Sequence, residues 1–166
     1  MRCESFEPII QADASVLILG SMPSVISLNR HQYYGNPRNH FWTILYSVLD
    51  LPLPSSYEQK LQGLLDNKIA LWDVLQLCTR AGSSDSSIKD EIANNFSDLF
   101  EGFPGINLIC FNGTKARDLW KKHVGSFSND NFDFITLPSS SPTPGKNVKS
   151  LDQKIDAWKI ITASLK

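Results

Sequence analysis

The sequence predicts an α/β protein, a three-layer α/β/α sandwich around a mainly parallel four-stranded sheet. The first observation is a set of four short apolar runs with the composition of strands buried on both faces, at residues 16–19, 69–72, 108–111 and 134–137. The second is that helical patterns separate these runs. Strands that alternate with helices are typical of a parallel sheet covered by helices on both faces.

The helical patterns are recognised by apolar residues at spacings of three and four. We expect helices over residues 38–49, 57–65, 88–100, 114–124 and 150–165. The last of these begins with Ser150 and has Gln153 three positions later, which is the pattern of a capping box.

Length and composition favour a single globular domain over residues 1–166, since 166 residues suffice for one sizeable core. Hydrophobic residues make up 42% of the chain and charged residues 20%, as in ordinary soluble proteins. The sequence has no apolar run near the ~20 residues of a membrane span, and its first ten residues lack the pattern of a secretory signal. We therefore expect no membrane association.

The cysteines indicate the redox compartment. Cys3, Cys78 and Cys110 are odd in number and far apart, which excludes a C-x-x-C motif. This usage is typical of reduced thiols in an intracellular protein of the cytoplasm or nucleoid.

The charge is distributed unevenly although the net charge is only −1. Residues 1–114 contain 7 Lys or Arg and 12 Asp or Glu, whereas residues 115–166 contain 9 and 5. A basic C-terminal third fits a surface that faces nucleic acid, but solvated helix faces alone also produce such a pattern.

Polar loops follow each predicted strand. The connection after the first strand spans residues 20–37, which is longer than most strand-to-helix connections and favours a functional loop. It and the helix start after it contain Arg30, His31, Tyr33, Tyr34, Asn36, Arg38, Asn39 and His40. The other strands end at Asp73, at residues 112–115 and at residues 137–142. In a parallel sheet these ends converge on one edge, where α/β proteins bind ligands.

Several known site patterns are absent from these loops. There is no cysteine–histidine pair and no G-x-S-x-G motif. Gly113, Thr114 and Lys115 resemble the end of a P-loop, but the glycine that should precede them is missing. We therefore exclude a nucleoside triphosphatase.

Five motifs occur in order along the chain, namely GSMPS, YYGNPRNHFW, IALWD, FNGTKA and LPSSSP. This combination resembles the uracil-DNA glycosylase superfamily, and within it the hypoxanthine-DNA (deoxyinosine) glycosylase branch. It implies the strand order 2-1-3-4 and a monomeric, monofunctional DNA glycosylase without metal or cofactor. The partner would be DNA that contains a deaminated base, and the product an abasic site.

The resemblance also implies roles for residues near the base. Many uracil-cleaving relatives have Asn or Asp where this chain has Met22, so the catalytic group is expected to be Asn39. The backbone N–H groups of Ser21 and Met22 would stabilise the leaving base, Phe41 would stack on it, and the Asn112 amide would read its edge. Asn39 as a helix N-cap and Asn112 as a turn residue are the structural alternatives.

The last loop is expected to contact the DNA backbone. Several members of the superfamily have histidine where this chain has Leu137. Ser139, Ser140 and Ser141 would grip phosphates, and residues 142–144, beginning with Pro142, would wedge into the base stack.

Three alternatives to this function remain open at the sequence level. The first is a uracil-DNA glycosylase, the second is a catalytically silent DNA-binding module on the same fold, and the third is a binding protein for small metabolites. The third leaves the serine-rich loop and the basic C-terminal third unexplained. The core motifs lack a lysine suited to imine formation, although Lys115 keeps a lyase activity conceivable.

Overall fold

The centre of the molecule is a parallel sheet. The computed structural model describes residues 1–125, 132–143 and 148–165. The sheet contains four strands, β2 (Val16–Gly20), β3 (Ile69–Asp73), β6 (Leu108–Asn112) and β7 (Asp133–Leu137). Their order is β3-β2-β6-β7 and all neighbours are parallel. Numbered among themselves along the chain, these strands have the order 2-1-3-4, so the predicted sheet is confirmed.

The sheet is buried where its strands are most apolar. Every residue of β2 and β3 is buried, whereas the edge strand β7 is partly exposed. In the registers, Gly20 lies opposite Asp73, and Asn112 lies opposite Leu137. The carboxyl ends of the four strands therefore meet at one edge of the sheet.

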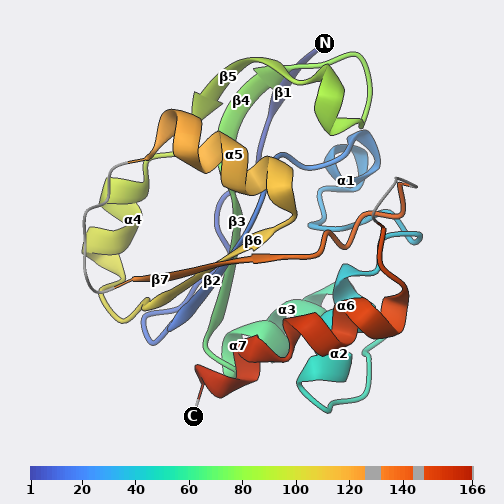
Figure 1. The fold of residues 1–166 in the computed structure, drawn as a ribbon, viewed down its shortest axis with the longest axis vertical. Helices are drawn as coiled ribbons and strands as arrows, with labels where there is room; N and C mark the ends of the chain where they lie inside the picture. The colour runs from blue at the N-terminus through green and yellow to red at the C-terminus, as the bar shows by residue number, and fades with distance from the viewer. Residues whose placement is uncertain (126–131, 144–147, 166) are drawn as a thin grey trace.

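Helices cover both faces of this sheet (Figure 1). One face carries α4 (Phe96–Gly102) and α5 (Thr114–His123). The other face carries four helices, α2 (Phe41–Val48), α3 (Tyr57–Asp66), α6 (Leu151–Trp158) and α7 (Ile160–Ala163). The three-layer prediction is confirmed, and the capping box at Ser150 and Gln153 is present. A short helix that the sequence did not predict, α1 (Val25–Arg30), lies in the long connection after β2.

A second, antiparallel sheet was not predicted. It consists of β1 (Arg2–Glu4), β4 (Leu75–Thr79) and β5 (Lys89–Ala93), in the order β1-β4-β5. The helix expected over residues 88–100 is therefore wrong in its first half. Two asparagines interrupt it: Asn94 donates from its side chain to Asp73 O and Leu75 O, and Asn95 caps the N-terminus of α4.

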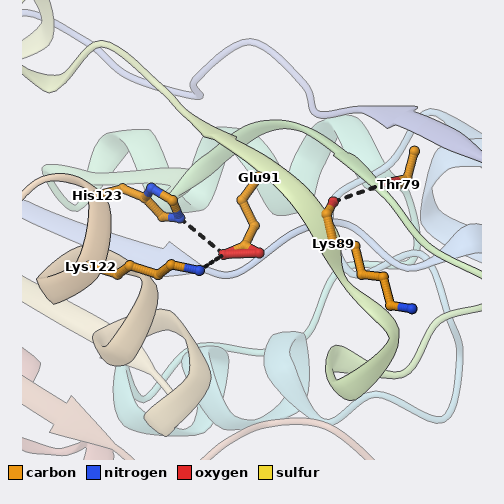
Figure 2. A network of polar contacts seen from close by, with 5 residues as sticks. All are labelled: Thr79, Lys89, Glu91, Lys122 and His123. Atoms are coloured by element: carbon orange, nitrogen blue, oxygen red, sulfur yellow. Dashed lines mark hydrogen bonds and ion pairs between the residues drawn. The ribbon is translucent and has the colours of Figure 1, made fainter.

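Polar contacts join the antiparallel sheet to the rest of the molecule (Figure 2). The Glu91 carboxylate of β5 accepts a 2.9 Å hydrogen bond from Lys122 of α5 and lies 3.0 Å from His123 Nε2. Within the sheet itself, Thr79 of β4 donates to the backbone oxygen of Lys89 of β5. The hydrogen bonds from His123 and Lys122 lower the pKa of Glu91.

Two further expectations concern the whole chain. Cys3, Cys78 and Cys110 are all buried and unpaired as disulfides. Among the described residues no helix is both long and apolar enough to cross a membrane.

Candidate active site

A cleft of about 760 Å³ lies at the carboxyl edge of the parallel sheet. Each of the four parallel strands contributes its end to the lining, as the sequence predicted. The lining also includes the start of the long connection after β2, the loop between β4 and β5, and part of α6. The main lining segments are residues 20–24, 83–86, 112–114 and 136–143.

The loop after β2 lines the cleft with residues 20–24. Ser21 Oγ donates to Asp85 Oδ1 at 2.8 Å, and Ser24 caps α1 by accepting from Ser27 N. The side chain of Met22 is buried. The backbone N–H groups of Ser21 and Met22 have no hydrogen-bond acceptor among the described residues. Their role at the leaving base stays a prediction.

A buried arginine holds this loop in place. Arg80 is 3% exposed and donates to Pro23 O at 2.6 Å and to Ser83 O at 2.7 Å. Ser83 Oγ in turn accepts from Val25 N at 2.9 Å. The β4–β5 hairpin therefore fixes the conformation of the loop after β2.

Asn112 joins the end of β6 to two other segments. Its Nδ2 donates to Tyr34 OH at 3.0 Å and to Ser140 Oγ at 2.9 Å, while its Oδ1 accepts from Ser140 N. Both amide hydrogens are thereby used within the protein. The next residue, Gly113, has φ +93°, and a Cβ there would lie 3.0 Å from Ser139 Cβ. A glycine is required for this close approach.

The serine-rich loop after β7 presents its three serines differently. Ser140 is buried, and its carbonyl accepts from His40 N at 3.0 Å. Ser139 is exposed, and its Oγ accepts from Ser141 N. Pro142 lines the cleft beside them. The predicted wedge is described only as far as residue 143, so its end at residue 144 lies outside the described residues.

Asn39 lines the cleft and also stabilises a helix. Its Oδ1 accepts from Phe41 N, in the first turn of α2, at 2.9 Å. Its Nδ2 donates to no other described residue. The N-cap position of α2 is His40, and Asn39 precedes it by one residue. The bond to Phe41 N and the predicted catalytic contact therefore involve different atoms of the Asn39 amide.

Phe41 lies below the surface of the cleft rather than in its lining. Its ring is fully buried and stacks on Tyr34, with centroids 3.9 Å apart and planes at 14°. Tyr34 itself lines the cleft, and its φ of +52° is unusual for a bulky residue. A base that entered the cleft would meet Tyr34 before Phe41.

The model of one protein family matches nearly the whole chain. The family model described as the uracil DNA glycosylase superfamily matches residues 7–162. The chain belongs to the uracil DNA glycosylase superfamily.

The similarity between this superfamily member and individual relatives extends over nearly the whole chain. A hypoxanthine DNA glycosylase of Methanosarcina barkeri is 44% identical over 95% of this chain and 96% of its own. A hypoxanthine DNA glycosylase of Methanosarcina acetivorans is 39% identical over 94% and 95%. A solution NMR structure from Methanosarcina acetivorans, described as that of a candidate uracil DNA glycosylase, has a TM-score of 0.81 with 37% identity and covers 99% of both chains.

The sequence placed Asp73 at the carboxyl end of its strand but gave no reason to assign its side chain a role in this glycosylase cleft. The residue is 3% exposed, and its Oδ2 is buried without a hydrogen-bond partner. Burial raises the pKa of Asp73 to about 7, Asp85 adds to this effect, and Arg80 opposes it. A Cβ at Gly20 would lie 2.6 Å from Asp73 Oδ1, so only glycine leaves room for this carboxyl group.

The cleft of this superfamily member is rich in uncharged hydrogen-bonding groups. Within the described part of the chain, no three His, Cys, Asp or Glu side chains gather closely enough to hold a metal ion. Hydroxyls, amides and backbone N–H groups suit a reaction in which charge develops on a leaving group and is stabilised by fixed donors.

Proposed function

We propose that this chain is a monofunctional DNA glycosylase. It hydrolyses the N-glycosidic bond of deoxyinosine in DNA, releases hypoxanthine and leaves an abasic site, and a single domain over residues 1–166 carries out the reaction. The relatives named hypoxanthine DNA glycosylase support the substrate. The observation that carries the chemistry is the uncommitted Nδ2 of Asn39 in the same cleft as two uncommitted backbone N–H groups.

The proposed reaction requires that the nucleotide leave the duplex, because the glycosidic bond cannot be reached inside the base stack. Breaking the bond leaves an oxocarbenium-like sugar and a purine that gains negative charge. The amide of Asn39 orients a water molecule with the second lone pair of Oδ1 and donates to the base from Nδ2. The N–H groups of Ser21 and Met22 stabilise the charge on the leaving purine.

We propose that Asp73 recognises the base edge. Hypoxanthine presents an acceptor at O6 next to a donor at N1–H. A neutral carboxyl group has the complementary donor and acceptor side by side, and a pKa near 7 keeps Asp73 largely protonated below that pH. Asn112 reaches the base only if one of its bonds to Tyr34 or Ser140 opens.

The exposure of the other predicted site residues indicates which of them can contact DNA. Tyr34 provides the outer ring for the base, and Phe41 supports it from below. Ser139 and Ser141 contact phosphates, whereas the buried Ser140 holds the loop against Asn112. Pro142 begins the segment that enters the base stack.

Uracil is the second candidate base, for a specific reason. Its O4 and N3–H present the same acceptor and donor pair as O6 and N1–H of hypoxanthine, so the carboxyl of Asp73 complements both. The cleft of about 760 Å³ has room for either base, and the relatives named hypoxanthine DNA glycosylase favour hypoxanthine.

The test is base excision from oligonucleotide duplexes that contain deoxyinosine, deoxyuridine or deoxyadenosine at one position. Alkali converts abasic sites into strand breaks, which gel electrophoresis measures. We expect the fastest single-turnover excision from deoxyinosine and none from deoxyadenosine. Excision of deoxyuridine alone would refute the hypoxanthine assignment, and strand cleavage without alkali, or borohydride trapping of a protein–DNA imine, would refute monofunctional hydrolysis.

A further inference from the structure

Lys154 places a positive charge inside the cleft lining without a negative partner. The residue is 3% exposed, yet it forms no ion pair with any Asp or Glu of the described residues. Burial lowers the pKa of Lys154. A buried ammonium group without a counter-charge is unfavourable. A bound anion would remove that penalty.

The position of Lys154 is fixed from two sides. Its helix, α6, begins at the capping box of Ser150 and Gln153. Its Nζ donates to Ser141 O at 3.3 Å and lies 3.5 Å from His40 Nδ1. An ammonium group has three donors, so two point at these partners and the third has no acceptor among the described residues.

The surroundings of this ammonium group favour an anion. His40 Nδ1 faces the ammonium group of Lys154 at 3.5 Å. Helix α2 begins directly after His40 and directs its positive end toward this region. Lys149 also lines the cleft and is exposed. The described acidic residues of the cleft, Asp73 and Asp85, come from β3 and the β4–β5 loop and not from this side.

We propose that Lys154 binds a backbone phosphate of the nucleotide that has left the duplex. The inference rests on the proposed function, because DNA is the anion that this function brings to the cleft. The serine-rich loop accepts from Lys154 at Ser141 O, lines the same cleft and supplies hydroxyls for the same phosphate backbone. Since Lys154 is buried, it contacts only a phosphate drawn into the cleft, whereas the exposed Lys149 also contacts DNA that remains stacked.

The test compares Lys154→Met with Lys149→Met on two duplexes. One is undamaged, and the other carries a tetrahydrofuran analogue of an abasic site, which has no base and cannot be excised. The dissociation constant is measured by fluorescence anisotropy between 50 and 200 mM salt. Each phosphate contact contributes about −0.9 to the slope of log affinity against log salt.

We expect Lys154→Met to reduce the slope by about one on the abasic-analogue duplex, to weaken binding there on the order of 10-fold, and to leave the undamaged duplex unchanged. Lys149→Met should reduce the slope on both duplexes. Because the analogue has no base, this result does not depend on whether hypoxanthine is the substrate. A failure to excise deoxyinosine would therefore refute the proposed function and leave this site standing.

Two outcomes would overturn the proposal. One is an unchanged slope for Lys154→Met on the abasic-analogue duplex, and the other is an equal change on both duplexes, which would make Lys154 a general surface contact. If inorganic phosphate raises the thermal midpoint of the wild type but not of the variant while the DNA slope stays unchanged, the site binds a small free anion instead. Lys154→Gln is a second neutral variant with the same expected slopes, should the methionine variant fold poorly.

Discussion

At the residue scale, Asn39 uses the two ends of its amide for different purposes. Oδ1 accepts from Phe41 N and stabilises the first turn of α2, while Nδ2 remains available in the cleft. An amide that accepts from the first N–H of a helix and keeps its own donor in a cleft has a fixed orientation before any ligand arrives. Such preorganisation is what a residue that positions water and base requires.

Two substitutions separate these purposes. Asn39→Ala should lower the single-turnover rate on deoxyinosine by about 10²–10³-fold, as for loss of one oxyanion-hole donor. It should also cost ~1 kcal/mol in stability, a shift of a few degrees in the thermal midpoint. Asn39→Asp keeps the acceptor for Phe41 N, so it should retain stability but lose the rate. If Asn39→Ala excises hypoxanthine at the wild-type rate, Asn39 serves α2 alone.

Asp73 makes the stability of the protein depend on pH. Its pKa rises from 3.8 to about 7 on folding, so between these values the native state holds a proton that the unfolded state has released. Stability therefore falls as pH rises through this window and is constant with respect to Asp73 above it. The shift corresponds to at most about 4 kcal/mol.

Asp73→Asn should remove this dependence. Relative to the wild type, the variant should gain stability steadily from pH 4 to pH 7, with no further gain above pH 8, measured by urea unfolding across the range. Asp118→Asn on the exposed surface of α5 is the matched control and should show no such trend. A constant difference between Asp73→Asn and the wild type at all pH values would show that the carboxyl group does not titrate near 7.

At the scale of elements, the small antiparallel sheet supports the cleft through Arg80. Replacing this residue by Met leaves Pro23 O and Ser83 O without their donors, which should cost about 1–3 kcal/mol in urea unfolding. The loop after β2 would lose its fixed conformation, so the excision rate should fall as well. Arg117→Met is the control, since among the described residues Arg117 pairs only with its exposed neighbour Asp118. This variant should change stability by less than ~0.5 kcal/mol. Wild-type stability and rate in Arg80→Met would mean that the hairpin contributes nothing to the loop.

The elements also show why some structure could be predicted and some could not. The parallel strands are continuous apolar runs, and such a run indicates a buried strand even when the neighbouring strands are unknown. Strands β4 and β5 alternate irregularly, and the apolar spacing of residues 88–100 matches a helix until Asn94 bonds to the end of β3. The pairing of β4 and β5 depends on contacts between distant residues, which a local pattern does not reveal.

The site residues also divide into those that the sequence predicted and those that it did not. Loops at strand ends were predictable, because a parallel sheet places them together. The importance of Asp73, Arg80 and Lys154 depends on their burial and on which partners they lack or find. These are tertiary properties, and in the sequence each residue is an ordinary charged residue beside a strand or in a helix.

At the scale of the whole molecule, the charge distribution predicts how DNA binding responds to salt. The C-terminal third supplies the positive charge, and the cleft side of it includes Lys149 and Lys154. If three phosphates are neutralised, affinity for the abasic-analogue duplex should fall roughly 40-fold between 50 and 200 mM salt. The exposed Lys121, in the half of α5 away from the cleft, should not contribute, so Lys121→Ala should keep the wild-type slope. Affinity that is constant across this range would show that the basic residues form only a solvated face. Equal losses in the slope of log affinity against log salt for Lys121→Ala and Lys149→Met would place DNA over α5 instead of over the cleft.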